Sequence, residues 1–132
     1  MSNTDEAAVR EVLGRYAKSL NDADADDAVA QYARDGVYYP YNLPTATGTD
    51  ELLAAYRQIF ATIRLDIAFT VHEVVVDGDL AYATTGSKGL VTVLEPDVTA
   101  PEENREVFVL KRSGGDWKIA RYMFNKPAAP GD

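Results

Sequence analysis

The sequence has 132 residues, no cysteine and a formal net charge of -8, with 46% hydrophobic and 26% charged residues. A chain of this length forms one domain, and without cysteine it has no disulfides, thiolate nucleophiles or iron–sulfur ligands. The negative charge opposes binding to nucleic acids and anionic lipids, and no apolar run is long enough to span a membrane. Because the N-terminal residues resemble no export signal, we expect a cytoplasmic protein that binds neither nucleic acid nor membrane.

Three amphipathic helices are predicted from apolar residues at helical spacing. The first covers roughly residues 5–20. The second follows Asp24 as its N-cap and continues until Asp35, and the third follows Thr49 as its N-cap and ends near Arg64. Each helix has one apolar face, so the three are expected to pack on a common core.

The remaining segments are typical of strands and turns. Pro40 restricts a short strand over residues 37–41 to a sheet edge or a strand end. Two hairpins follow, and their turns contain Asp77-Gly78-Asp79 and Ser113-Gly114-Gly115-Asp116. Their strands cover residues 65–76, 80–94, 105–112 and 117–124. Between the hairpins, residues 95–103 contain two prolines and are expected to form a mobile loop.

The order of these elements predicts an α+β fold in which the helices pack on a mainly antiparallel sheet. We place a single domain at residues 1–126 and expect residues 127–132 to be a disordered tail. The strands are apolar on both faces, and the helices cover only one of them. We therefore expect the second face to contact another copy of the chain in a homodimer.

Four stretches, residues 15–24, 32–37, 48–52 and 117–125, resemble the nuclear-transport-factor-2-like superfamily, and the likeness covers nearly the whole chain. That superfamily includes ketosteroid isomerase and the SnoaL-like polyketide cyclases. The segments 104–106 and 121–125 are most similar to small proteins encoded in enediyne polyketide gene clusters. The resemblance implies a cone-shaped fold of three N-terminal helices on a curved sheet. The cone would admit an apolar or polyketide-like molecule, commonly in a dimer.

Ketosteroid isomerase uses an aspartate base beside an oxyanion hole made of a tyrosine and a protonated carboxylic acid. The resemblance places Tyr16 at the tyrosine position, where its hydroxyl would enter the pocket. The position of the base falls near Tyr39-Pro40 and that of the protonated acid near Phe108, and neither offers a carboxylate. We therefore expect no steroid-isomerase chemistry by that route.

Strand alternation supplies the other polar candidates. One face of the last strand carries Trp117, Ile119, Arg121, Met123 and Asn125. Its large apolar members predict that this face lies under the helices, so Arg121 and Asn125 would enter the cone with Glu106 opposite Arg121. Either Glu106 and Arg121 form a structural ion pair, or Arg121 binds a carboxylate or enolate oxygen. In the second case Glu106 orients Arg121 or acts as a base with a raised pKa.

A ligand in the cone is expected to contact mainly aromatic and apolar side chains, with tyrosine hydroxyls as polar points. The predicted binding residues are Tyr32, Tyr56, Phe60, Tyr82, Lys88, Phe108, Trp117, Met123 and Asn125, and Tyr38 is a further tyrosine of this kind. Lys88 either points inward near the mouth or extends into solvent. The single histidine, His72, is out of phase with Phe69 and Val71, which predicts a position on the convex face or in a dimer interface. We expect no metal site and no cofactor.

Two functions agree with these patterns. The first is a cofactor-independent enzyme that isomerises, cyclises or dehydrates a small hydrophobic molecule of the polyketide or polyene type. Its catalytic residues would be Tyr16, Glu106 and Arg121. The alternative is a non-catalytic ligand-binding or assembly domain that uses the same cone. The missing aspartate base favours the alternative, whereas the polar set of Glu106, Arg121 and Asn125 favours the enzyme.

Overall fold

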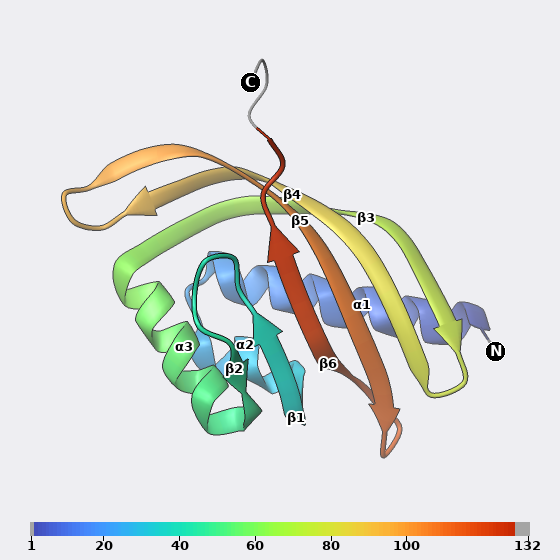
Figure 1. Ribbon diagram of the computed structural model, residues 1–132. Helices are drawn as coiled ribbons and strands as arrows, with labels where there is room; N and C mark the ends of the chain where they lie inside the picture. The colour runs from blue at the N-terminus through green and yellow to red at the C-terminus, as the bar shows by residue number, and fades with distance from the viewer. Residues whose placement is uncertain (1, 129–132) are drawn as a thin grey trace.

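The computed structural model of the protein describes residues 2–128, with side chains from residue 4 onward. It has an α+β fold in which three helices lie under a curved, open, mixed sheet of six strands (Figure 1). In chain order the elements are α1 Ser2–Asn21, α2 Ala25–Ala30, β1 Tyr32–Tyr39, β2 Ala46–Thr47, α3 Gly48–Thr62, β3 Ile63–Asp77, β4 Leu80–Val93, β5 Val98–Ser113 and β6 Asp116–Asn125. Among residues 2–128, no helix is long and apolar enough to cross a lipid bilayer.

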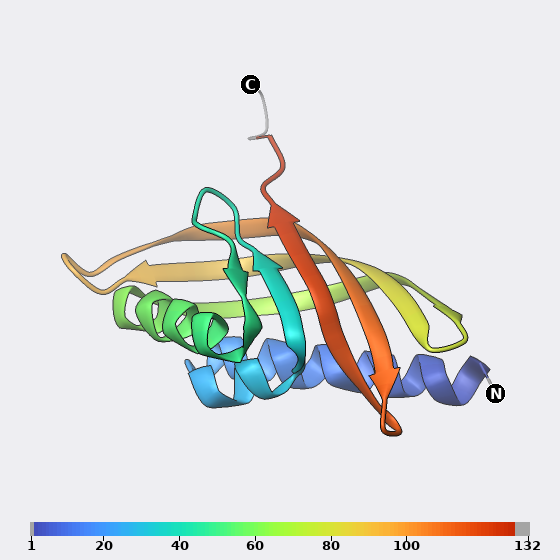
Figure 2. The ribbon, with the colours of Figure 1, turned by 60° about the horizontal axis from the view of Figure 1, so that its bottom comes forward.

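The sheet has the strand order β2-β1-β6-β5-β4-β3, in which β1 pairs with β6 in parallel and the other pairs are antiparallel. Strands β3, β4 and β5 are long and arch over α1 and α3 (Figures 1 and 2). All three helices lie on the concave side of this arch. We call the opposite, solvent-facing side of the sheet the outer face.

Several element boundaries differ from the prediction because backbone pairing between distant segments determines them. The second helix ends at Ala30, since the carbonyl of Gln31 accepts a hydrogen bond from Ile119 N at 2.8 Å and the chain joins the sheet as β1. The third helix has Thr47 as its N-cap, in place of the predicted Thr49. The carboxyl group of Asp24 caps the second helix as predicted, through Asp27 N at 3.0 Å.

The predicted mobile loop at residues 95–103 is wrong over most of its length. Strand β5 already begins at Val98, which pairs with Val93 of β4. Pro101 is accepted in this strand because β6 reaches only as far as Arg105 of β5, which leaves residues 98–104 at an edge of the sheet. Of the predicted tail, residues 129–132 lie outside the described residues.

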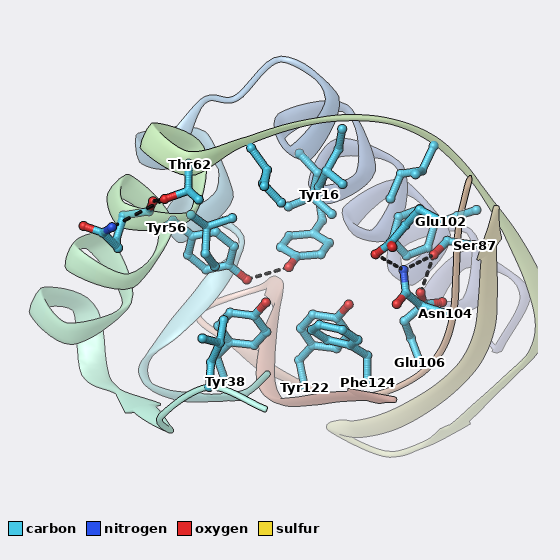
Figure 3. Close-up of a pocket in the computed structure, with 18 residues that line it drawn as sticks. Tyr16, Tyr38, Tyr56, Thr62, Ser87, Glu102, Asn104, Glu106, Tyr122 and Phe124 are labelled. Atoms are coloured by element: carbon cyan, nitrogen blue, oxygen red, sulfur yellow. Dashed lines mark hydrogen bonds between the residues drawn. The ribbon is translucent and has the colours of Figure 1, made fainter. Parts of the chain in front are cut away.

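A β-bulge in β6 changes which side chains face the helices. Val109 of β5 pairs with Arg121 and Leu110 pairs with Ile119, so Ala120 is an extra residue on β6. Ile119 and Ala120 are both buried, and the alternation restarts one residue later. Beyond the bulge, Tyr122 and Phe124 therefore face the helices (Figure 3), while Arg121, Met123 and Asn125 are exposed on the outer face.

Gly89 of β4 provides a test of how closely β3 and β4 pack, and Gly14 of α1 serves as its control. A Cβ atom at Gly89 would lie 2.0 Å from the carbonyl oxygen of Asp66, whereas a Cβ at the exposed helical Gly14 would meet no atom within 4 Å. Gly89→Ala should lower the free energy of unfolding by roughly 1–3 kcal/mol, because backbone must move to make room. Gly14→Ala should raise it by about 0.5–1 kcal/mol. Urea unfolding measures both, and an unchanged midpoint for Gly89→Ala would contradict the register.

Candidate functional site

A cavity of about 310 Å³ lies between helices α1 and α3 and the concave face of the sheet (Figure 3). One wall is apolar and carries Leu65, Ile67 and Phe69 of β3. Tyrosine side chains cluster at one end, and polar side chains of β4 and β5 line the other. The cavity therefore combines an apolar interior with two separate polar ends.

The tyrosine end is held together by hydrogen bonds between hydroxyl groups. The hydroxyl of Tyr56 on α3 lies 2.5 Å from that of Tyr16 on α1 and 2.7 Å from that of Tyr32 on β1. Tyr38 stacks on Tyr56 with a centroid separation of 5.0 Å, and on Tyr122 at 5.4 Å. Because each ring is fixed by neighbours from other elements, these hydroxyls are held in fixed directions.

These phenols are donors at neutral pH. Burial raises the pKa of Tyr16, Tyr38, Tyr56 and Tyr122 above the ordinary tyrosine value, so each hydroxyl keeps its proton. The Tyr38 hydroxyl has no hydrogen-bond partner among the described residues. No fully buried side-chain nitrogen or oxygen of these residues lacks a partner, so the Tyr38 hydroxyl is not sealed in the core. Because Tyr38 also lines the cavity, its hydroxyl is available to a ligand oxygen there.

The opposite end contains the carboxylate of Glu106 on β5. Its Oε1 accepts a hydrogen bond from Thr85 Oγ1 at 2.6 Å, and its Oε2 accepts one from Ser87 Oγ at 2.6 Å. Thr85 is directly opposite Glu106 in the β4–β5 ladder, and Ser87, two residues further, shares the same face. The sheet register therefore supplies one hydroxyl donor for each carboxylate oxygen.

The environment of Glu106 makes it suited to proton transfer. The residue is only 2% exposed, and burial raises the pKa of its carboxyl group, partly offset by the hydrogen bonds from Ser87 and Thr85. Each oxygen keeps a lone pair that these hydroxyls do not occupy. Because the pKa of its conjugate acid is raised, such a carboxylate is a stronger base toward a bound molecule than an exposed glutamate is.

The family model described as SnoaL-like domain matches residues 13–122. The chain belongs to the SnoaL-like domain family. No curated protein matches this chain, but many solved structures share its fold.

A ketosteroid isomerase-like protein from Erwinia carotovora atroseptica is 32% identical, with a TM-score of 0.92, and the match covers 96% of this chain and 99% of that one. A conserved protein from Planctomyces limnophilus is 23% identical with a TM-score of 0.81, covering 95% of this chain and 99% of that one. A proposed dehydratase of the NTF2-like family from Streptomyces avermitilis is 19% identical with a TM-score of 0.82, covering 96% and 99%. The last two show the fold alone, and together the three support the superfamily that the sequence resembles.

Two of the three predicted catalytic side chains of this SnoaL-like domain line the cavity, namely Tyr16 and Glu106. The predicted position of Arg121 inside the cone is wrong. Its guanidinium is on the outer face, where Nη1 donates to the carbonyl oxygens of Ala120 at 2.6 Å and Asp35 at 3.2 Å. The predicted pair with Glu106 is absent, because Arg121 pairs with Val109 on the outer face and Phe124 lies opposite Glu106.

The predicted binding residues are spread over four environments. Tyr56 lines the cavity. Three residues are buried behind its lining: Tyr32 bonds to Tyr56, Phe60 packs near Tyr56, and Phe108 stacks on Tyr122 at 4.2 Å. Trp117 is buried near the start of α1, where its indole N–H donates to Asp5 at 3.3 Å.

The predicted positions of Tyr82, Met123 and Asn125 in the pocket are wrong, and Lys88 does not line the pocket either. All four are exposed on the outer face, and Asn125 there accepts a hydrogen bond from Arg105 at 2.8 Å. Lys88 takes the solvent alternative. His72 is also exposed on the outer face, as its phase predicts. Among the described residues, no three histidine, aspartate or glutamate side chains come together as metal ligands.

The lining residues that were not predicted from the sequence include Ser87, Asn104, Tyr122 and Phe124. Ser87 and Asn104 had a signal, since Thr85 and Ser87 share a phase in β4 as Asn104 and Glu106 do in β5. To predict from this shared phase that Ser87 and Asn104 lie beside Glu106, one needs the β4–β5 register, which the hairpin lengths alone do not give. Tyr122 and Phe124 had no signal, because strict alternation places them on the other face.

The hydroxyl network predicts unequal effects for two similar substitutions. Tyr56→Phe removes the group that joins Tyr16 to Tyr32 and leaves two buried hydroxyls without that partner. It should lower the free energy of unfolding by about 1–3 kcal/mol. Tyr38→Phe removes a hydroxyl without a protein partner among the described residues, and should change the free energy little. Thermal unfolding compares the two, and equal losses would contradict the network.

Proposed function

We propose that this protein is a cofactor-independent enzyme that transfers a proton on a polyketide- or polyene-like molecule containing a carbonyl group. Glu106 removes the proton next to the carbonyl, and the tyrosine hydroxyls hold the carbonyl oxygen. The observation that carries this proposal is that a buried carboxylate and a cluster of protonated phenols face one apolar cavity. Isomerisation, dehydration and cyclisation all can begin from the enolate that this step forms.

The lining of the cavity supports a small, neutral substrate. The volume of about 310 Å³ is near the lower end of the roughly 300–1,000 Å³ typical of small-molecule sites. Among the described residues that line it there is no lysine, arginine or histidine. A carboxylate or phosphate group would thus lose its hydration without gaining a cationic partner. Aromatic and aliphatic walls instead favour a conjugated or ring-containing molecule.

The step conserves atoms and charge within the substrate and the protein. The C–H bond breaks, its proton joins a free lone pair of the Glu106 carboxylate, and the electron pair moves to the carbonyl oxygen as an enolate. Phenol donors fixed by their neighbours stabilise this oxygen without having to reorganise. Protonated Glu106 then returns the proton to another carbon, which isomerises the substrate, or to a departing β-hydroxyl group, which dehydrates it.

The comparisons agree with this class of chemistry. The solved structure with 32% identity is described as ketosteroid isomerase-like, and a proposed dehydratase has the same fold. The resemblance to proteins of enediyne polyketide gene clusters supports a polyketide or polyene as the substrate. The carboxylate of this protein lies on β5, however, and not near Tyr39-Pro40. The proposed base is therefore in a different place from that of ketosteroid isomerase.

We also propose that the protein forms a homodimer through its outer face. Val75 pairs with Tyr82 across β3 and β4, and Val107 pairs with Met123 across β5 and β6. These four side chains are 40%, 42%, 50% and 52% exposed, respectively. Burying them against a second copy would remove this apolar surface from water. Light scattering at micromolar concentration should give the mass of a dimer, and a monomer would contradict the proposal.

Glu106→Gln tests the catalytic part of the proposal with 3-cyclohexen-1-one as the probe, whose conjugated isomer is followed by ultraviolet absorption. The substitution should lower the rate about 10²–10⁴-fold, because glutamine cannot accept the proton. Glu103→Gln, on the exposed side of the same strand, is the matched control and should keep the rate. The wild-type rate should fall as the pH is lowered through the raised pKa of Glu106, since only the ionised form is a base.

A second measurement separates catalysis from binding alone. Exchange of the probe's α-hydrogens with deuterated water reports proton removal even where no isomer accumulates. If the wild-type protein binds the ketone, as measured by calorimetry, but catalyses neither exchange nor isomerisation, the enzyme proposal is contradicted. That result would favour the alternative, a non-catalytic ligand-binding or assembly domain.

A further inference from the structure

A chain of hydrogen bonds connects Lys126, which follows β6, to the carboxylate of Glu106. Lys126 Nζ donates to Asn104 Oδ1 at 2.9 Å, Asn104 Nδ2 donates to Ser87 Oγ at 3.3 Å, and Ser87 Oγ donates to Glu106 Oε2 at 2.6 Å. The inner members of the chain lie at the polar end of the cavity (Figure 3). A residue outside the cavity is thus linked to the group proposed as the base.

The lysine determines the direction of every bond in this chain. An ammonium group only donates, so the oxygen of the Asn104 amide must face Lys126 and its NH₂ group must face inward. That NH₂ group donates to Ser87 Oγ, so the serine oxygen accepts there and its own proton remains for Glu106. The opposite orientation of the amide would present an oxygen to Ser87 and attract the hydroxyl proton away from the carboxylate.

Burial and a second contact hold this arrangement. Ser87 is 1% and Asn104 7% exposed, so their hydrogen bonds meet little competition from water. Glu102 accepts from Lys126 at 2.8 Å and from Asn104 Nδ2 at 3.1 Å, and its side chain is 18% exposed. The amide of Asn104 is therefore fixed on both sides by groups that agree on its orientation.

We propose that Lys126 is a positioning residue for Glu106: through Asn104 it makes the Ser87 hydroxyl donate to the carboxylate, and so keeps that carboxylate ionised and correctly oriented. Aligned hydrogen bonds of this kind strengthen one another in a buried site. The catalytic meaning of this inference rests on the proposed function. The effect of Lys126 on the ionisation of Glu106 does not depend on the proposed function.

The other charged and titratable groups around Glu106 are not connected to it through this chain of hydrogen bonds. Helix α1 contributes Tyr16 and β6 contributes Tyr122, and both are neutral phenols; β4 contributes only hydroxyl donors. Glu102 on β5 is itself paired with Lys126. His72 of β3 and Lys126 both lower the pKa of the Glu106 carboxyl group, and His72 lies on the outer face of the sheet. Of these two, Lys126 is connected to the carboxylate by the hydrogen-bonded chain.

The experiment measures the titration of Glu106 by NMR in protein labelled with ¹³C at the glutamate carboxyl carbons, with Glu106→Gln used to assign the signal. Lys126→Met should raise the pKa of Glu106, because the charge and the amide orientation are both lost. Lys126→Arg keeps the donor and the charge and should restore the wild-type titration. Lys88→Met removes an equivalent charge from the outer face and is the matched control, with an expected smaller shift.

A double-mutant cycle separates the chain from simple charge attraction. In a Ser87→Ala background the last link is missing, so Lys126→Met should shift the titration of Glu106 much less than it does in the wild-type protein. Equal shifts in both backgrounds, an unshifted titration in Lys126→Met, or a Lys88→Met shift as large would overturn the inference. Circular dichroism shows whether each variant is folded, and Lys126→Gln replaces Lys126→Met if the latter is not.

The ketone assay keeps this inference separate from the proposed function. If the protein is active, the acidic limb of the pH–rate profile should move to higher pH in Lys126→Met and return in Lys126→Arg. If the protein shows no turnover but the titration of Glu106 depends on Lys126 through Ser87, the positioning role stands and the proposed function fails. If the protein shows turnover but the titration of Glu106 does not depend on Lys126, the proposed function stands and the positioning role fails.

Discussion

An arginine inside an apolar cavity needs a charged partner, and without one its desolvation costs several kcal/mol. The bulge at Ala120 avoids this cost, because the extra residue moves Arg121 to the outer face and gives its place to aromatic side chains. Tyr122 then stacks between Phe108 and Tyr38, and Phe124 lies opposite Glu106. The single added residue in β6 therefore gives the cavity an aromatic floor and keeps Arg121 out of its lining.

The described residues of the lining include no cation, and the two polar ends of the cavity keep distinct properties. Burial keeps the phenols of Tyr16 and Tyr56 protonated, while two hydroxyl donors hold the carboxylate of Glu106 in place. A donor cluster and a buried carboxylate on opposite sides of an apolar space form the arrangement that the proposed enolate chemistry requires. The same fold hosts other activities elsewhere, so the proposed function rests on these side chains and not on the fold.

Much of the fold was predictable because hydrophobic periodicity and turn residues act locally. The apolar stripe of α1, the N-cap Asp24 and the turn at Asp77-Gly78-Asp79 each have a signal within a few residues. Tyr16 and Glu106 were also found, the first by resemblance and the second by its phase in β5. The end of α2 and the start of β5 were missed because they depend on pairing with distant strands, at Ile119 and Val93.

The sequence alone determined the class of fold, the chain's membership in a superfamily and the apolar, tyrosine-rich character of the pocket, since these follow from composition, periodicity and resemblance. Only the tertiary structure decided which side chains enter the cavity. A bulge reverses the alternation of a strand without any change in residue type, and strand register determines which hydroxyl meets which carboxylate. Both depend on pairing between segments far apart in the chain, such as Ser87 with Asn104, which no local pattern encodes.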